Sequence, residues 1–437
     1  MTTRTAKYSY RAIPTQEQAQ WLSSAFGAVR VVYNNYLWQK EQVYCGKLTT
    51  VNRLDRFSTL PTDYNWLRDH SQKILEQSRR QAETAYKNFF DGLAGRRANR
   101  VGKPTFKKKR AGGSLSWNGA SLQTKKLSND WMAVRLPKGP KNEEWLKFRL
   151  SRELPTKPTG VTLKRSPTGD YTVSFTVQQQ IAEPKTTGTA AGVDLGLTDL
   201  VTVVKTDGSR YKVASPKNYR RAERKLAHLQ QNLSRKASGS QNREKARLAV
   251  AKQHGRTAAQ RLDLARKIAF RLADENQAVS LETLNLKGLV KNKKLSKSFH
   301  DAGLGQLVQL IESAAQRLGT EVLRVDRWAP TSQACSVCGV IDGPKDLSVR
   351  VWECGACGAL LDRDYNAAVN VLALAVGHTD SLNGSRERIR PSLEQLAAPD
   401  EAMLNEGATP RYKAHRPSKR RSRKVSLARR AKLTTTF

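Results

Sequence analysis

Gly192-Val193-Asp194-Leu195-Gly196 sets a carboxylate between two glycines at the end of an apolar run, and two later segments place acids in comparable settings. Val279-Ser280-Leu281-Glu282 ends another apolar, β-type run with an acid, and Asp362-Arg363-Asp364-Tyr365-Asn366-Ala367-Ala368 opens an alanine-rich helical run. A fold that lays the two strands side by side, with the helix nearby, would gather all three carboxylates. In a strongly basic chain such a cluster is out of place unless a cation or a reaction needs it.

Carboxylates gathered in this way predict a divalent-cation site. Carboxylate oxygens suit Mg²⁺ or Mn²⁺, and two such ions roughly 3.5–4 Å apart stabilise both the attacking and the leaving oxygen of a phosphodiester. The predicted catalytic residues and metal ligands are Asp194, Glu282 and Asp364. Asp362 competes for the third position, but Asp364 is preferred because it starts the helix, which leaves Asp362 as a helper or cap. Each motif alone has a plainer interpretation, since an Asp that opens a helix is commonly an N-cap.

The segments around the acids predict an α/β domain. Its expected elements are strands at 192–196, 200–205 and 210–213, a helical hairpin within 216–275, a strand at 278–281, a helix at 304–318, a strand at 321–325 and a helix at 364–376. This β-β-β-α-β-α-β-α order is that of an RNase H-like domain with one insertion before its last helix. In that fold the first acid lies on the first strand, the second at the end of the fourth and the third on the last helix.

The insertion carries four of the five cysteines in two CxxC pairs. Cys335 and Cys338 form the first pair, Cys354 and Cys357 the second, and a glycine follows each. Four thiolates at this spacing are typical of a tetrahedral structural Zn²⁺ site, and no open coordination position is evident. We therefore expect zinc to stabilise the insertion and to take no part in catalysis.

The remaining chain predicts a helical region and a small β domain. Residues 7–13 alternate as in a strand, and Thr15 with Gln18 forms a capping box before a long helix. A second helix is expected near 71–90. A basic connector over 96–110 leads into short alternating runs at 115–180, which indicate a small β-barrel or sandwich.

The charge of the chain predicts a polyanionic partner. Its 437 residues include 77 Lys and Arg against 38 Asp and Glu, a net charge of +39, while a 38% hydrophobic fraction is enough to build cores. Nucleic acid is the expected partner, although a ribosomal-type protein or a basic protein held on acidic membranes would share this charge. The sequence has no apolar run of 18 residues and no signal-peptide core, so we expect a cytoplasmic protein with no membrane association.

Taken together, these motifs resemble TnpB, a family of transposon-encoded RNA-guided DNA endonucleases related to compact type V CRISPR effectors. The resemblance rests on the acidic segments and paired CxxC motifs quoted above. Further family-like segments are Tyr86–Phe90, Gly102–Arg110, Asp301–Gly303 and Asn383–Pro391. One departure is Leu361, which stands where a histidine commonly precedes the Asp-Arg-Asp motif.

The resemblance implies a multidomain α/β architecture. It places the first strand of a wedge β-barrel at 1–14, a helical recognition domain at 15–95, the rest of the barrel at 96–185, a RuvC nuclease domain at 186–330 and 362–405, and a zinc-ribbon target-loading insertion at 331–361. The basic tail at 406–437 is expected to be disordered without nucleic acid, because it lacks apolar periodicity.

The resemblance also implies the partners. They are a guide RNA derived from the transposon end and a double-stranded target DNA with a short adjacent motif. The protein would act as a monomer within a ribonucleoprotein, in a prokaryotic cytoplasm and at the nucleoid when bound to DNA. Expected nucleic-acid contacts are Lys73, Gln77, Lys103, Lys107, Lys108, Lys109 and Arg110. Three alternatives stay open: a miniature type V CRISPR effector, a guided DNA-binding repressor that has lost cleavage, and an RNase H-type transposase acting without RNA.

Overall fold

The structure, a computed structural model of the chain, describes residues 3–380 apart from 98–99, 110–111, 120–121 and 347. Arg110, the last part of the predicted nuclease domain after residue 380, and the basic tail at 406–437 lie outside the described residues. None of the helices in the described part combines the length and apolarity needed to cross a membrane.

The N-terminal strand belongs to a seven-stranded antiparallel sheet built mostly from residues 113–180. Its strands are β1 (Thr3–Ile13), β2 (Gly113–Asn118), β3 (Thr124–Lys126), β4 (Trp131–Arg135), β5 (Trp145–Arg149), β6 (Gly160–Arg165) and β7 (Tyr171–Gln180). Their order is β2-β6-β7-β1-β5-β4-β3, so the first strand of the chain lies in the middle of the sheet. No ladder joins the edge strands β2 and β3 in the described residues, and closure into a barrel stays a prediction.

Two long helices interrupt this sheet in the sequence. They are α1 (Gln16–Tyr44) and α2 (Gln72–Leu93), separated by the 3-10 helices η1 (Phe57–Thr59) and η2 (Thr62–Asp69). The predicted capping box is present, because the Thr15 hydroxyl accepts from the Gln18 amide at 3.2 Å and the Gln18 side chain accepts from the Thr15 amide at 3.1 Å. Apolar residues of both helices join the core of the sheet.

The predicted α/β domain forms around a five-stranded sheet of order β10-β9-β8-β11-β12. Its strands are β8 (Ala190–Asp194), β9 (Asp199–Lys205), β10 (Arg210–Ala214), β11 (Ala278–Glu282) and β12 (Glu321–Val325). β8, β11 and β12 run parallel, while β9 is antiparallel to both β8 and β10. The element order along the chain is the predicted one, apart from two short helices between β11 and the helix at Leu304–Leu318.

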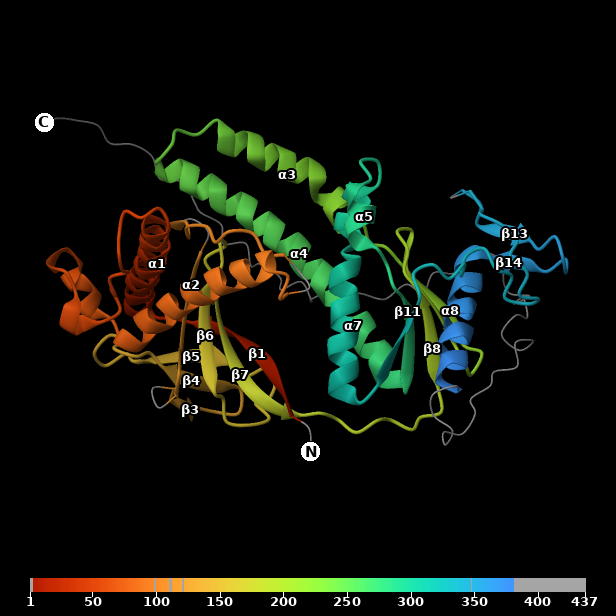
Figure 1. The fold of residues 1–437 in the computed structure, drawn as a ribbon, viewed down its shortest axis with the longest axis horizontal. Coiled ribbons are helices and arrows are strands. Elements are labelled where there is room, and N and C mark those ends of the chain that lie inside the picture. The colour runs from red at the N-terminus through yellow and green to blue at the C-terminus, as the bar shows by residue number, and fades with distance from the viewer. Residues whose placement is uncertain (1–2, 98–99, 110–111, 120–121, 347, 381–437) are drawn as a thin grey trace, which may run out of the picture. The chain divides into compact units, whose positions relative to one another are not determined.

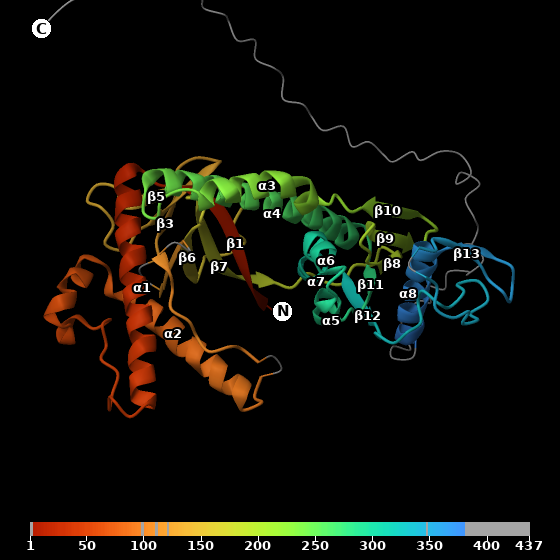
Figure 2. The ribbon, with the colours of Figure 1, turned by 90° about the horizontal axis from the view of Figure 1, so that it is seen from above.

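Helices cover both faces of this sheet, which explains why its strands read as almost continuous apolar runs. α4 (Gln241–Glu275) and α7 (Leu304–Leu318) pack on one face with Val193 and Val279, whereas α8 (Arg363–Asp380) packs on the other with Ala190 and Val204. α3 (Asn218–Ser234) lies along α4, and the two form the predicted helical hairpin (Figures 1 and 2).

Two short helices were not predicted from the sequence. α5 (Leu286–Lys291) and α6 (Ser296–Ala302) fill the lysine-rich stretch between β11 and α7. The cysteine-bearing insertion contains the antiparallel strands β13 (Val351–Glu353) and β14 (Leu360–Asp362).

Candidate active site and metal centre

Two of the three predicted acids are the last residues of neighbouring strands, at the same edge of the sheet. In the parallel ladder of β8 and β11, Val193 lies opposite Leu281. Asp194 and Glu282 are the next and last residues of these strands, so their positions are adjacent. Carboxyl ends of parallel strands are where open α/β sheets commonly carry their ligand sites.

The third acid comes close because α8 packs tightly against β8 (Figure 1). A Cβ atom placed on Gly192 would lie 2.2 Å from the Ala368 carbonyl oxygen and 2.6 Å from the Leu372 Cβ. Only glycine permits this approach of helix to strand. Asp364, in the first turn of α8, then lines the same cleft of about 980 Å³ as Asp194 and Glu282.

The electrostatics of this cleft disfavour ionisation of all three acids at once. Burial, followed by the charges of Glu282 and Asp364, raises the pKa of Asp194 from 3.8 to about 7. The Leu195 backbone N–H and Lys212 lower it, but only in part. Like charges disfavour joint ionisation, and a divalent cation relieves that repulsion.

Lys212 and Asp362 organise the start of α8 beside these acids. Asp362 Oδ1 accepts from the backbone N–H groups of Asp364 at 3.0 Å and Tyr365 at 2.9 Å, so Asp362 caps the helix. The Lys212 ammonium lies 2.9 Å from Asp362 and 3.7 Å from Asp364. Burial alone would lower the pKa of Lys212, but its hydrogen bond to Asp362 and the nearby carboxylates raise it.

Two further residues reach the acids from the cysteine-bearing insertion, and sequence analysis did not identify them. The buried Thr331 donates a hydrogen bond from its hydroxyl to Glu282 Oε1. Arg350 Nη1 lies 3.6 Å from Asp364 Oδ2, and Arg350 Nη2 donates to the Thr198 hydroxyl at 3.0 Å. The only sequence signal for Thr331 and Arg350 was their place in an insertion that returns to the acidic helix.

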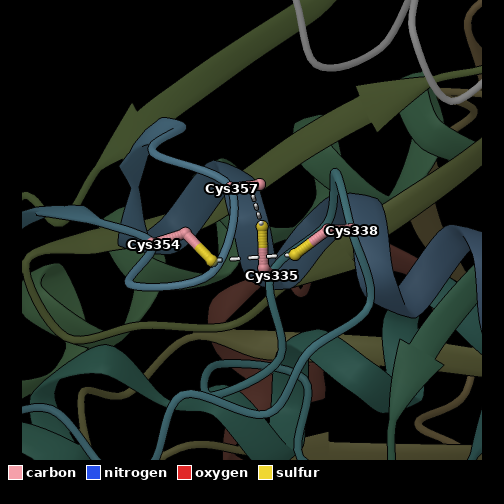
Figure 3. Close-up of side chains that lie close together, drawn as sticks. All are labelled: Cys335, Cys338, Cys354 and Cys357. Carbon is pink, nitrogen blue, oxygen red and sulfur yellow. Dashed lines mark hydrogen bonds between the residues drawn. The ribbon is translucent and has the colours of Figure 1, made fainter.

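The four cysteines converge on one point (Figure 3). Their sulfur atoms all lie within 4.8 Å of one another, and the Cys335–Cys357 and Cys338–Cys354 sulfurs are 3.7 Å apart. Ligands about 2.3 Å from a tetrahedral zinc ion would be about 3.8 Å from each other, so the geometry fits Zn²⁺. Each pair turns in the same way: Gly339 N–H donates to the Cys335 carbonyl and Gly358 N–H to the Cys354 carbonyl, both at 2.9 Å.

Hydrogen bonds of the buried Asn366 join the insertion to α8. Asn366 donates to the Ala334 carbonyl at 2.8 Å and accepts from the Ser336 backbone N–H at 2.8 Å. Leu361, the departure from the family pattern, packs with Trp352 and the buried cysteines as part of the small core of the insertion. The cysteine cluster and the acidic cleft therefore both contact α8.

None of the described residues that are predicted to touch nucleic acid lines the acidic cleft. Lys73, Lys108 and Lys109 are exposed, and Gln77 is half-buried on α2. The exposed Lys103 pairs with Glu41 at 2.7 Å. Lys107 differs from a free surface cation, because its ammonium lies 3.9 Å from the centre of the Tyr33 ring and burial lowers its pKa. A structural role is thus evident for Lys107, while contacts by the others stay predictions.

Three protein families match separate parts of the chain. Residues 172–293 match a family described as "Probable transposase", IS605 OrfB, and residues 305–371 match "Cas12f1-like, TNB domain". Residues 1–47 match a "Helix-turn-helix domain". In the structure this last region is strand β1 followed by the single helix α1, so the chain has no helix-turn-helix in the described part of that region.

Known proteins resemble the chain over most of its length. A Streptomyces pristinaespiralis protein named "Putative RNA-guided DNA endonuclease" is 36% identical over 394 residues, covering 89% of this chain and 92% of the relative. The Escherichia coli K12 protein "Putative RNA-guided DNA endonuclease InsQ" is 27% identical, over 72% of this chain and 77% of its own. A solved Cas12f1–sgRNA–target DNA complex shares the fold with a TM-score of 0.53 at 16% identity, over 82% of this chain and 83% of that one. From the extent of the first match and the IS605 OrfB domain, the chain belongs to the TnpB family.

Proposed function

We propose that this protein is an RNA-guided DNA endonuclease that hydrolyses phosphodiesters in the cleft formed by Asp194, Glu282 and Asp364. One observation carries the chemistry: three carboxylates from distant segments meet in one cleft, where burial and mutual repulsion raise the pKa of Asp194 to about 7. A cluster of this kind is unfavourable unless it binds cations. The names of the similar proteins from Streptomyces and Escherichia coli support guided DNA cleavage as the reaction.

Asp194, Glu282 and Asp364 would hold two Mg²⁺ or Mn²⁺ ions, which would supply activation of water and neutralisation of the leaving 3′-oxygen. The protein's own residues prepare the cleft for this chemistry. Thr331 donates a hydrogen bond to Glu282, and Lys212 and Arg350 lie 3.7 Å and 3.6 Å from the Asp364 carboxylate. Because these partners are held by folded elements, the carboxylates need little reorganisation when substrate enters.

We assign the five-stranded sheet and its helices to an RNase H-like, RuvC-type nuclease domain. The strand order and the position of each acid support the assignment, since Asp194 ends the first strand, Glu282 ends the fourth and Asp364 opens the last helix. The seven-stranded sheet would be the wedge domain, with α1 and α2 as the recognition domain. The insertion at 331–361 would load the target strand.

The cysteine cluster is assigned a structural zinc ion. All four ligand positions are filled by cysteine, and Asn366 ties the cluster to the helix that carries Asp364. A closed tetrahedral site supplies folding free energy and has no position for substrate. Zinc would therefore affect cleavage only through the order of the insertion.

The net charge of +39 supports a guide RNA and double-stranded target DNA as partners. In guided nucleases the base pairs of the heteroduplex carry the sequence specificity, while the protein holds the phosphate backbone. We propose that one protein molecule acts with one guide, and that the guide derives from the transposon end. The presence of all three acids argues against a guided repressor that has lost cleavage.

The test is to change the guide. RNA that co-purifies with the protein would be sequenced, and the protein would then be loaded with two guides that differ only in their targeting segment. In Mg²⁺, each complex should cut only the DNA that matches its own guide beside the adjacent motif. Cutting that ignores the guide, or joining of DNA ends without RNA, would contradict the proposal and favour an autonomous transposase.

A further inference from the structure

Trp328 is a large aromatic side chain that the fold leaves in solvent. Its exposed fraction is 77%, the highest of the eight tryptophans. The ring lies in the turn after β12, and the guanidinium of Arg327 lies 4.2 Å from its centre. Trp side chains bury about 150–250 Å² in cores and interfaces, so an exposed one beside a reactive cleft indicates a ligand that covers it.

The turn places Trp328 in the lining of the carboxylate cleft. Asp326 Oδ1 accepts from the Trp328 backbone N–H at 2.7 Å, and Trp328 lines the same cleft as the three acids. Three residues further on, Thr331 donates to Glu282. That length of chain spans at most about 11 Å, so the backbone of Trp328 lies within a short distance of the residue that contacts Glu282.

The composition of the rim indicates which ligand covers the ring. Four arginines line the cleft, namely Arg220, Arg327, Arg350 and Arg363. Guanidinium groups bind phosphate oxygens, and an aromatic face among them suits a nucleobase on the same strand. A volume of about 980 Å³ matches the size of sites that take drug-sized ligands, which admits a few nucleotides of one strand but no duplex.

We propose that Trp328 stacks on an unpaired base of the DNA strand whose phosphate lies at Asp194, Glu282 and Asp364. The contact anchors the strand next to the phosphate to be cut. Because every base has a π-face, the contact selects single-stranded DNA without selecting sequence. The proposal rests on the proposed nuclease function for the identity of the strand.

The first experiment compares cleavage by Trp328→Ala, Trp328→Phe and a control, Tyr44→Ala. Tyr44 is 83% exposed at the end of α1 and does not line the cleft. Base–aromatic stacking contributes about a 5- to 150-fold effect per base, so Trp328→Ala should slow cleavage of bound target within that range. Trp328→Phe should keep most of the rate, and all three variants should keep the wild-type melting temperature. Equal rates for Trp328→Ala and Tyr44→Ala would overturn the proposal.

The second experiment removes the base instead of the ring. Targets with a single abasic site at successive positions around the cut are tested with the wild type and Trp328→Ala. At one position the abasic site should slow the wild type to the rate of the variant and leave the variant unchanged. If every abasic site slows both proteins equally, Trp328 does not stack on a base.

A binding measurement separates this proposal from the nuclease function itself. Short single-stranded DNA containing 2-aminopurine is mixed with guide-free protein in Ca²⁺, and its fluorescence is followed. Wild type and Tyr44→Ala should quench the base more strongly than Trp328→Ala. Equal quenching by all three would overturn the stacking proposal even if guided cleavage holds, while the expected difference would support it even if guided cleavage fails.

Discussion

Asp194 has the most perturbed carboxyl environment in the cleft, and the cause is local. It ends a buried strand, so desolvation and the nearby Glu282 and Asp364 all favour its protonated form. The folded state therefore keeps a proton on Asp194 at pH values where the unfolded chain has released it. Asp194 therefore lowers the stability of the folded protein at neutral pH.

The raised pKa of Asp194 should be visible in the pH dependence of the protein's stability. Asp194 has a pKa of about 7 in the folded protein against an ordinary 3.8. Its contribution to the free energy of unfolding is thus fully present below about pH 4 and is lost as pH rises to about 7. Asp194→Asn should raise the melting temperature in EDTA at pH 8 and have little effect at pH 4. An equal shift at both pH values would contradict the assigned pKa.

The sequence predicted that the three acids would come together, and they line one cleft, but the residues that contact them could not be predicted. Asp194, Glu282 and Asp364 each sit at an element boundary that local periodicity locates. Thr331 meets Glu282 across 49 residues and Lys212 meets Asp362 across 150, and no local pattern encodes such contacts. The cap formed by Asp362 was one of two roles that the sequence left open for it, and the structure favours the cap.

At the scale of elements, the contact between β8 and α8 sets the position of Asp364. Gly192 faces the Ala368 carbonyl and Leu372 with no room for a Cβ atom. Gly192→Ala should push the helix away, destabilise the protein by about 1–3 kcal/mol, as is typical of overpacking, and reduce cleavage. Gly208→Ala provides a control in a nearby turn, where an added Cβ meets nothing within 4 Å but the positive φ of 81° costs some strain. Chemical denaturation measures the loss of stability of each variant, and parallel assays measure its loss of cleavage. If Gly192→Ala loses no more cleavage than Gly208→Ala, the contact between β8 and α8 does not set the position of Asp364.

The stability of the cysteine-bearing insertion should depend on the proposed zinc ion. We expect one zinc atom per chain, and Cys335→Ser or Cys357→Ser should lower the melting temperature of the insertion and reduce cleavage indirectly. Elemental analysis with differential scanning calorimetry provides the measurement, and Cys45→Ser, at an exposed cysteine outside the cluster, is the control. A well-folded sample that contains iron, or no metal, would contradict the assignment.

Regular elements were more predictable than the connections between them. The period of apolar residues located α7 at Leu304–Leu318, and β12 at Glu321–Val325, with the observed bounds. Helices α5 and α6 were missed because their stretch is lysine-rich, with weak periodicity. Asp301, at the end of this stretch, caps the distant helix α3. Its carboxylate accepts from the backbone N–H groups of Arg220 and of Tyr219, which lies 82 residues away in the sequence.

At the scale of the whole molecule, the basic charge determines how the protein meets polyanions. Residues 411–437 hold eleven Lys or Arg and no acid. If they bind phosphates of the guide RNA, deletion after Pro410 should make the slope of log affinity against log salt shallower by about 0.7–0.9 for each phosphate that they neutralise. The deletion should leave hydrolysis intact. Filter binding of guide RNA at several salt concentrations measures the slope, and equal slopes for the full-length and shortened proteins would rule out such binding.

The proposed mechanism requires that the three carboxylates act together on a guided target. The most direct measurement compares wild type with Asp194→Ala, Glu282→Ala and Asp364→Ala, each loaded with the same guide and tested for both binding and cutting of the same DNA in Mg²⁺. Each variant should bind the target nearly as well as the wild type and cut it only at background level, whereas Asp362→Asn should cut with a milder loss. Guided cutting at the wild-type rate by any of the three alanine variants would contradict the account.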